Sequence, residues 1–211
     1  MREKLAGVVL AGGLSRRMGG GDKSLKQLGG RPMLARVIER LAPQVGAVVL
    51  NANGDPARFK PFGLPVAPDP IAGFAGPLAG VLAGMEWASG SGAAFTHVVS
   101  VASDTPFFPA DLVDRFVAAA DGRPERIVLA SSDGNRHPVF GLWPMALRQD
   151  LAHWMAGTDT YKVLVWTGRH DCVLCPFDMI PFQGRTIDPF FNANTPEDLA
   201  EAEGLLTELA G

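Results

Sequence analysis

Short, continuous apolar runs alternate with amphipathic segments along the first two thirds of the chain. Five runs have the length and apolar character of strands in a parallel sheet: 5–10, 47–50, 64–67, 96–102 and 126–131. The first of them is a continuous apolar run of the kind expected for a central strand. Between them, the apolar spacing predicts helices over 32–41, 78–88 and 111–120. Strand–helix–strand units of this length imply parallel, right-handed crossovers. The pattern therefore predicts an α/β fold with a mostly parallel central sheet.

The last third of the chain has a less regular pattern. It predicts a strand of mixed orientation, two helices and a further strand, at 137–143, 145–155, 160–166 and 173–174 respectively. Thr195-Pro-Glu-Asp198 predicts the start of a final helix, with a capping box in which aspartate replaces the commoner glutamate. No internal repeat or linker interrupts the sequence, so we expect a single domain over 1–211.

Composition and charge exclude several classes of protein. Of the 211 residues, 47% are hydrophobic and the formal net charge is −3, which is unlike a disordered chain or a nucleic-acid-binding surface. The amino terminus leads into the first strand without the apolar region of a signal peptide. No run approaches the ~18 apolar residues of a membrane span. We therefore expect a cytoplasmic protein with neither a nucleic-acid nor a membrane partner.

The two cysteines of the sequence, Cys172 and Cys175, form a C-x-x-C pair close to His170. A structural zinc site needs four ligands, and the sequence has no second cysteine pair to complete one. A thioredoxin-like motif would open a helix, whereas Val173 and Leu174 have strand character. We expect buried or half-buried thiols without chemistry, and a metal or redox role stays an alternative.

A glycine-rich loop with cationic residues follows the first predicted strand. It runs from Leu10 to Lys23 as L-A-G-G-L-S-R-R-M-G-G-G-D-K. Glycine lets backbone N–H groups approach an anion closely and the cationic side chains add charge, so the loop is typical of a phosphate cradle. It is not a P-loop, because Asp22 stands where the last glycine belongs. The G-x-G-x-x-G spacing of dinucleotide-binding folds is also missing after this strand.

Polar residues stand at the carboxyl ends of three other predicted strands: Asn51, Asp69 and Asp104. Ligands of open parallel sheets bind at this edge, so we expect these residues to share a site with the glycine loop. Asp104 suits Mg²⁺, a hard cation that proteins hold through one or two carboxylates and substrate phosphates. Asparagine and aspartate are also common in turns that end a strand. The residues alone therefore leave open whether these three bind a ligand or only form turns. No Ser-His-Asp or Cys-His catalytic constellation is apparent.

Residues 10–19 match L-A-G-G-x-S-x-R-M-G, the start of the L-A-G-G-x-S-x-R-M-G-x-x-K signature of NTP-dependent nucleotidyltransferases, and the lysine of the signature follows at Lys23 after one additional residue. Within that group, the chain most closely resembles the molybdenum cofactor guanylyltransferases. The similarity continues in further segments: G-P-L-A-G at 76–80, D-T-P at 104–106, G-x-x-H-P at 134–138 and N-x-N-T-P at 192–196. The stretch 148–185 carries no motif of the family. The resemblance implies a three-layer, Rossmann-like nucleotidyltransferase fold.

The resemblance also implies roles for individual residues. In a nucleotide-binding half, 1–107, the residues that bind GTP would be Leu10, Ala11, Gly12, Gly13, Lys23, Asn51, Asp69 and Asp104. Three of the first half's residues would be catalytic: Arg17, Lys23 and Asp104. The two cations would brace the phosphates, and Asp104 would hold Mg²⁺. In an acceptor-side half, 108–211, the acceptor-binding residues would be His137, Asn192 and Asn194.

The function implied by the resemblance is transfer of GMP from GTP to the phosphate of molybdopterin or Mo-molybdopterin, with release of pyrophosphate. Such an acceptor implies partner proteins of molybdenum cofactor synthesis and delivery. The alternatives are a CTP-dependent molybdopterin cytidylyltransferase, a sugar-phosphate nucleotidyltransferase and a non-catalytic nucleotide-binding module. L-A-G-G and G-P-L-A-G favour the guanine enzyme. The joint presence of Arg17, Lys23 and Asp104 favours an enzyme over a binding module.

Overall fold

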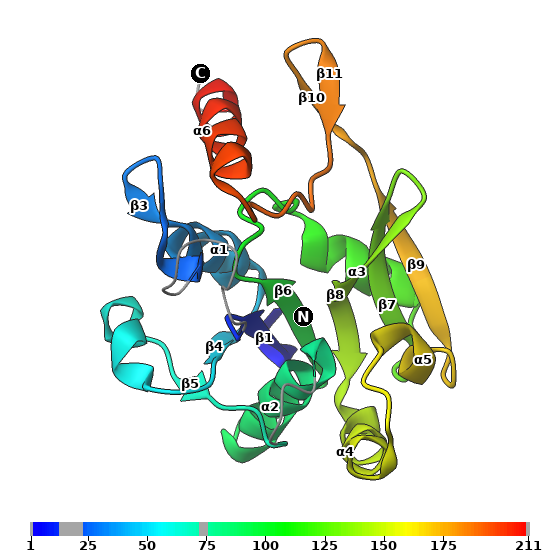
Figure 1. Ribbon diagram of the computed structural model, residues 1–211. Coiled ribbons are helices and arrows are strands. Elements are labelled where there is room, and N and C mark those ends of the chain that lie inside the picture. Colours follow the sequence, from blue (N-terminus) through cyan, green and yellow to red (C-terminus); the bar gives the residue numbers. More distant parts are fainter. Residues whose placement is uncertain (1, 13–22, 72–75, 210–211) are drawn as a thin grey trace.

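The central element of the fold is a mostly parallel β-sheet. The computed structural model describes residues 2–12, 23–71 and 76–209, and within these ranges the sheet has seven strands (Figure 1). In spatial order they are β5 (Val66–Ala67), β4 (Ala47–Asn51), β1 (Leu5–Leu10), β6 (His97–Ala102), β8 (Asn135–Pro144), β7 (Ile127–Ser132) and β9 (Cys172–Phe177). β8 runs antiparallel to both neighbours, and the other neighbouring pairs are parallel. The predicted α/β class and the mixed orientation of the 137–143 strand are thus confirmed.

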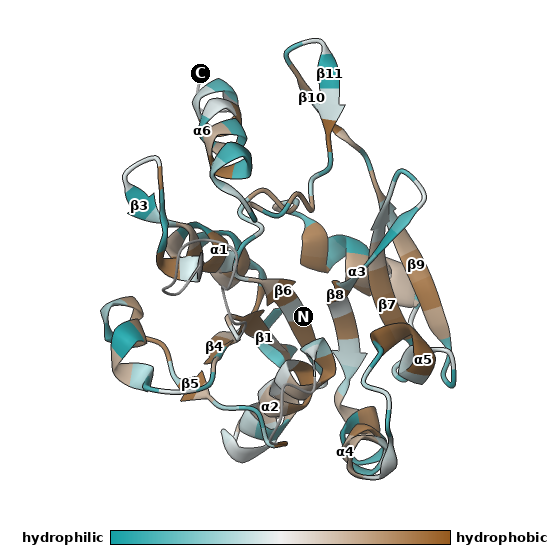
Figure 2. Ribbon diagram, in the orientation of Figure 1, coloured by the Kyte–Doolittle hydropathy of each residue, from teal (hydrophilic) through white to brown (hydrophobic). Residues whose placement is uncertain are grey.

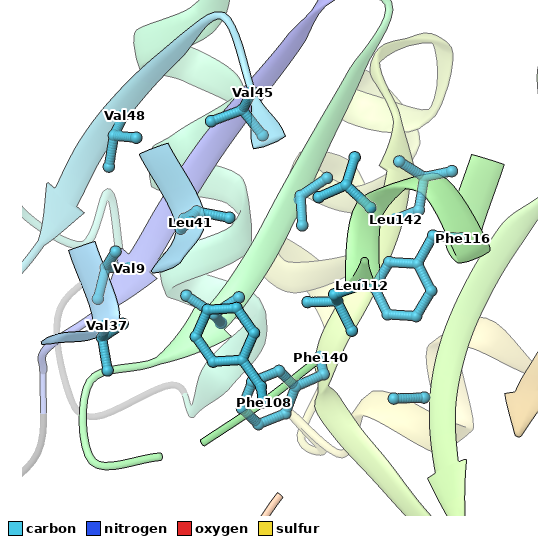
Figure 3. Close-up of a cluster of buried hydrophobic side chains, with 14 of the residues drawn as sticks. Val9, Val37, Leu41, Val45, Val48, Phe108, Leu112, Phe116, Phe140 and Leu142 are labelled. Atoms are coloured by element: carbon cyan, nitrogen blue, oxygen red, sulfur yellow. The ribbon is translucent and has the colours of Figure 1, made fainter. Parts of the chain in front are cut away.

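Helices cover both faces of this sheet (Figure 1). One face packs against α1 (Met33–Leu41) and α3 (Leu112–Ala120), and the other against α2 (Pro77–Gly90), α4 (Arg148–Gly157) and α5 (Val163–Thr167). Each face has its own hydrophobic core, as expected where strands are apolar on both sides. Figure 3 shows part of the first core, in which Leu41 of α1 and Leu112 and Phe116 of α3 belong to one cluster.

Two hairpins and the last helix form a small third cluster. The hairpins are β2 (Gln27–Leu28) with β3 (Arg31–Pro32) and β10 (Ile180–Phe182) with β11 (Arg185–Ile187), and the helix is α6 (Pro196–Leu209). Their buried side chains pack with Phe107, which follows β6: Leu28, Phe182, Ile187, Ala202 and Leu205. Figure 2 shows the contrast between the hydrophobic central strands and the more hydrophilic surface of α6. The cluster therefore attaches α6 to the region beyond the end of β6.

The remaining helical segments are short 3-10 turns: Arg2–Lys4, Lys23–Leu25, Ala42–Gln44, Pro56–Phe62 and Met145–Leu147. The last of these turns leads directly into α4, so the helix predicted over 145–155 is divided into two parts. Across the described ranges, no helix has the length and apolar character needed to cross a membrane.

Most other predicted elements are present, and the differences have local causes. Pro32 closes the β2–β3 hairpin, so α1 begins one residue later than predicted. The strand predicted over 64–67 is reduced to β5, because Pro65 has no N–H for a sheet ladder. The helix predicted over 160–166 begins only at Val163, since the Thr158 hydroxyl bonds to the backbone of Thr160 and competes with helix formation. The sequence does not predict the two hairpins, whose strands are too short to show a period of two.

Candidate active site

The carboxyl ends of four parallel strands lie in register. Leu10 at the end of β1 is the partner of Asn51 at the end of β4 and of Ala102 at the end of β6. Asn51 is in turn the partner of Ala67 at the end of β5. The segments that carry the predicted nucleotide-binding residues therefore leave the sheet along a single edge, which is where α/β proteins bind ligands.

Asp69 is held by two asparagines from the end of β4. Asn51 donates from Nδ2 to Asp69 Oδ1 at 2.9 Å and to the carbonyl of Ala67 at 3.2 Å. Asn53 donates from Nδ2 to Asp69 Oδ2 at 2.7 Å and accepts from the Asp69 N–H at 2.9 Å. Asn51 thus bridges two strand ends instead of forming a local turn. Each Asp69 oxygen keeps a second acceptor position for a ligand.

A glycine of α2 makes room for Asn51, which is only 3% exposed. A Cβ on Gly80 would overlap Asn51 Oδ1 and would lie 2.6 Å from Leu10 Cδ2. On the other side, a Cβ on Gly12 would lie 3.7 Å from the same oxygen. Gly80 is the last residue of the G-P-L-A-G segment. That segment therefore lets α2 pack closely against the strands that carry Leu10 and Asn51.

Asp104 lies beside the segment that carries Asn192. The Asp104 carbonyl accepts from the N–H of Ala193 at 3.1 Å. The hydroxyl of the next residue, Thr105, donates to the side-chain oxygen of Asn192, 87 positions further along the chain. The Asp104 side chain is partly exposed. These contacts bring the D-T-P and N-x-N-T-P segments together at the end of β6.

Asn194 stands at the start of α6, where the predicted capping box is confirmed. Thr195 Oγ1 accepts from the Asp198 N–H at 3.1 Å. Asp198 Oδ2 accepts from the backbone N–H groups of Asn194 and Thr195, each at 2.8 Å. The Asn194 residue itself is exposed. The cap therefore sets the backbone direction of the N-x-N-T-P segment where it enters α6.

Ser132, His137 and Asp188 meet in space, although sequence analysis finds no such arrangement. The Ser132 hydroxyl lies 2.5 Å from His137 Nε2 and donates to Asp188 Oδ1 at 2.9 Å, and Asp188 Oδ2 lies 3.4 Å from the same Nε2. A catalytic triad places serine and carboxylate at opposite ring nitrogens, whereas here both approach Nε2. Burial lowers the pKa of His137 and the Asp188 charge opposes this shift. The arrangement of Ser132, His137 and Asp188 therefore does not have the geometry of a catalytic triad.

The loop residues predicted to cradle and brace the phosphates are only partly described. Gly13 and Arg17 lie outside the described residues. Lys23 begins the 3-10 helix Lys23–Leu25, which leads directly into the β2–β3 hairpin. Gly29 and Gly30 have φ values of 55° and 72°, as a two-residue hairpin turn requires. The hairpin takes the place of the helix that a P-loop needs after its lysine.

The metal-binding chemistry of the site depends on few protein groups. Within the described ranges, no group of three or more His, Cys, Asp and Glu side chains is placed to hold a metal ion. Mg²⁺ does not need such a group, because it commonly binds through one or two carboxylates together with substrate phosphates. A partly exposed carboxylate such as Asp104, at the sheet edge where α/β proteins bind ligands, therefore has the chemistry to hold a Mg²⁺ ion together with phosphate.

Cys172 and Cys175 lie on opposite faces of β9, because residues an odd number apart in a strand point to opposite sides. Cys175 belongs to the core beneath α1 and α3, and Cys172 packs against the core beneath α2, α4 and α5. Both thiols are free, and burial raises the pKa of each. Thiols separated by the sheet cannot share a disulfide or a metal ion. The expectation of buried or half-buried thiols is confirmed, and the geometry argues against a disulfide or metal ion shared by the two; that the thiols carry no chemistry stays a prediction.

We expect a mild oxidant to leave Cys172 and Cys175 unlinked in the folded protein, because β9 holds their side chains apart. Intact-mass spectrometry before and after treatment measures this. The matched control is the same chain in denaturant, where the freed C-x-x-C closes readily. A disulfide formed in the folded protein, or zinc bound by the folded chain through Cys172 and Cys175, would contradict the assignment.

Four residues of this site are missed by sequence analysis. Asn53 lies two residues after the predicted site residue Asn51, and Thr105 lies inside the D-T-P segment, so both are next to positions that the sequence did predict. Ser132 and Asp188 belong to no recognised segment, and only the fold brings them to His137. His137 in turn joins the site through Asp188, which begins the chain segment that leads to Asn192.

Comparisons with known proteins identify the family. A family model described as a MobA-like NTP transferase domain matches residues 7–173. The chain is also 53% identical to a molybdenum cofactor guanylyltransferase of Bradyrhizobium sp. (strain ORS 278), over 94% of this chain and 92% of that protein. The chain belongs to the molybdenum cofactor guanylyltransferase family. It is accordingly a nucleotidyltransferase, and the resemblance carried by the glycine loop is confirmed.

Solved structures agree about the fold. Molybdopterin-guanine dinucleotide biosynthesis protein A from Archaeoglobus fulgidus matches with a TM-score of 0.72 at 21% identity, over 96% of this chain and 99% of that chain. A Mycobacterium tuberculosis protein in complex with manganese matches with a TM-score of 0.65 at 16% identity, over 94% and 97% of the two chains. The three-layer nucleotidyltransferase fold is thus confirmed.

Proposed function

We propose that this chain transfers GMP from GTP to the phosphate of molybdopterin or Mo-molybdopterin, forming molybdopterin guanine dinucleotide and pyrophosphate. The observation that carries the proposal is the single sheet edge at which the Asn51–Asn53–Asp69 cluster and Asp104 lie, in a chain of this family. Family membership supports guanylyl transfer over the cytidylyl, sugar-phosphate and non-catalytic alternatives.

On the nucleotide side, GTP would lie over the ends of β1, β4 and β5. The backbone of Leu10, Ala11, Gly12 and Gly13 would approach the nucleotide, where small residues permit close contact. Guanine differs from adenine and cytosine in presenting an N1–H and a 2-amino donor side by side. A carboxylate with both oxygens oriented can accept that pair, and Asp69 has this chemistry because Asn51 and Asn53 fix its two oxygens.

At the reacting phosphate, this chain would supply position and charge. Asp104 would hold a divalent cation. A protein with the same fold has been solved in complex with manganese, which supports divalent-metal binding by this fold. Bound Mg²⁺ polarises phosphate oxygens and neutralises charge as pyrophosphate leaves. Lys23 and Arg17 would brace the leaving phosphates, Lys23 as a point charge and Arg17 through two N–H groups. Such electrostatic help suits phosphoryl chemistry that needs no covalent enzyme intermediate.

On the acceptor side, molybdopterin would lie near His137, Asn192 and Asn194. We propose that 1–107 and 108–211 act as one domain, and the hydrogen bond between Ala193 and Asp104 across that division supports this. Proteins of molybdenum cofactor synthesis and delivery would provide the acceptor and receive the product, and the reaction would take place in the cytoplasm.

Nucleotide binding by calorimetry tests the proposed function. We expect GTP to bind more tightly with Mg²⁺ than without it, and CTP, ATP and NAD to bind at least about tenfold more weakly, because buried polar groups left unpaired penalise the wrong base. Transfer of GMP to molybdopterin, detected as the dinucleotide product, completes the test. Preference for CTP would support the cytidylyltransferase activity in place of the guanylyltransferase activity. Binding of all nucleotides with similar affinity would contradict a site that selects guanine.

Lys23→Ala should weaken GTP binding without altering the preference for guanine, because a lysine that reaches the phosphates does not read the base. The same calorimetric comparison of GTP with CTP measures this. Lys4→Ala is the matched control, since Lys4 is exposed and lies at the opposite, amino-terminal edge of β1. A switch of preference from GTP to CTP in the Lys23 variant would refute the phosphate role.

A further inference from the structure

The segment 188–194, which we call the asparagine segment, is attached at both ends. At its far end, the Asp104 carbonyl accepts from Ala193 and the Thr105 hydroxyl donates to Asn192. At its near end, Asp188 Oδ1 accepts from the Ser132 hydroxyl at 2.9 Å and from the Phe190 N–H at 2.8 Å. Ser132 and Asp188, which form the near attachment together with His137, have no assigned role in binding or chemistry.

The direction of the hydrogen bonds at the near end follows from counting protons. A serine hydroxyl has one proton, and Ser132 donates it to the Asp188 carboxylate. The Ser132 oxygen can then only accept from His137 Nε2, which lies 2.5 Å away and must carry the proton of the neutral ring. The result is a one-way relay of donors, from His137 to Ser132 to Asp188, which ends on a negative charge and is strengthened by it.

The surroundings of the relay limit its freedom. The register between β7 and β8 shifts after Leu129, where Gly141 and then His137 are the partners, so that 138–140 form a bulge. The bulge aims His137 at the asparagine segment, where its ring lies 4.5 Å from the ring of Phe190. Ser132 is 2% exposed. Hydrogen bonds shielded from water in this way are stronger than those at the surface.

We propose that Ser132 and Asp188 are positioning residues that act through the relay with His137 to set the asparagine segment for the acceptor. The inference rests on the proposed function and deepens it. Loss of the relay would release the near end of the segment, and Asn192 would lose its fixed place beside Asp104. The Asn51–Asn53–Asp69 cluster lies on other strands and shares no contact with the relay. Loss of the relay should therefore affect the acceptor much more than GTP.

The chain offers a matched control on the opposite side of the sheet. His170 Nε2 lies 3.1 Å from Asp150 Oδ2, which also accepts from Trp166 Nε1 at 2.9 Å. The side-chain exposures of this pair are 16% for His170 and 41% for Asp150, against 17% for His137 and 28% for Asp188. Asp150→Ala thus removes a similar histidine–carboxylate pair that does not contact the asparagine segment.

The experiment compares Asp188→Ala, Asp188→Asn and Asp150→Ala in the full chain. Hydrogen exchange of peptides that cover 188–194, GTP affinity by calorimetry, and the acceptor KM with molybdopterin are measured for each. Asp188→Ala should speed exchange of this segment and raise the acceptor KM about tenfold, the size expected for a lost hydrogen bond to a charged group. Its GTP affinity should stay within about twofold of the unmodified chain, because one distant hydrogen bond carries little coupling.

The two other variants separate positioning from general stability. Asp188→Asn keeps an oxygen that can accept from Ser132 and Phe190, so it should recover most of the acceptor affinity. Asp150→Ala should leave both the exchange of 188–194 and the acceptor KM unchanged. Normal exchange or a normal acceptor KM in Asp188→Ala overturns the proposal, as does a parallel loss of GTP affinity. Absence of transfer by the unmodified chain would instead overturn the proposed function, and exchange alone would then decide whether the relay holds the segment.

Discussion

Replacing Asp104 with alanine should abolish GMP transfer while leaving the fold intact. A carboxylate that holds the catalytic cation contributes several kcal/mol of transition-state stabilisation, so turnover should fall by about 10³-fold or more. The fold should persist because the Asp104 side chain is partly exposed and because its bond to Ala193 comes from the backbone carbonyl, which alanine retains. Steady-state transfer at saturating Mg²⁺ measures the loss, and the melting temperature reports on the fold.

Asp111→Ala is the control for this substitution. Asp111 is an exposed carboxylate that precedes α3 and makes no capping hydrogen bond with its side chain. Its removal changes the net charge by the same amount without touching the end of β6. We expect the Asp111 variant to transfer GMP at a normal rate. Magnesium-dependent turnover by the Asp104 variant within about tenfold of normal would show that another group holds the metal.

The nucleotide side of the site could be predicted because its signals are local. Asn51, Asp69 and Asp104 each stand at the end of a predicted strand, so the strand and the polar residue at its end appear together in the sequence. The strand ends then align by sheet register, which parallel topology imposes without further information. The C-x-x-C pair was not resolved in this way, because the predicted strand, 173–174, ended short of both cysteines, and only the longer β9 places them on opposite faces.

The acceptor side could not be predicted to the same depth, because its contacts join distant parts of the chain. Ser132 and Asp188 are ordinary residues in the sequence, 56 positions apart, and they meet only after β8 is inserted between β6 and β7 with its bulge. The contact of Thr105 with Asn192 likewise depends on how α6 is attached beyond β6. Motifs can indicate that such residues matter, but the pairing is a property of the tertiary structure.

Gly80→Ala should impair both stability and nucleotide binding, although alanine is the better helix former. In an exposed helix the change would stabilise by about 1 kcal/mol. Here the new Cβ would overlap Asn51 Oδ1 and lie 2.6 Å from Leu10 Cδ2, and overpacking of this kind costs about 1–3 kcal/mol. To remove this overlap, either α2 or the Asn51 amide must move. Movement of the Asn51 amide would break its hydrogen bond to Asp69, which orients that carboxylate. We therefore expect a lower melting temperature together with GTP affinity reduced by about tenfold or more.

Gly84→Ala separates these two effects, because Gly84 lies one turn further along α2. Its Cβ would lie 2.8 Å from Val8 Cβ, so it is overpacked against β1 to a similar degree but away from Asn51. The Gly84 variant should lose stability and keep its GTP affinity when measured well below its melting temperature. If both variants bound GTP normally, the packing of α2 against Asn51 would have no effect on nucleotide binding. If both lost affinity equally, the site would depend on the position of α2 as a whole, and the specific role of the glycine in G-P-L-A-G would be refuted.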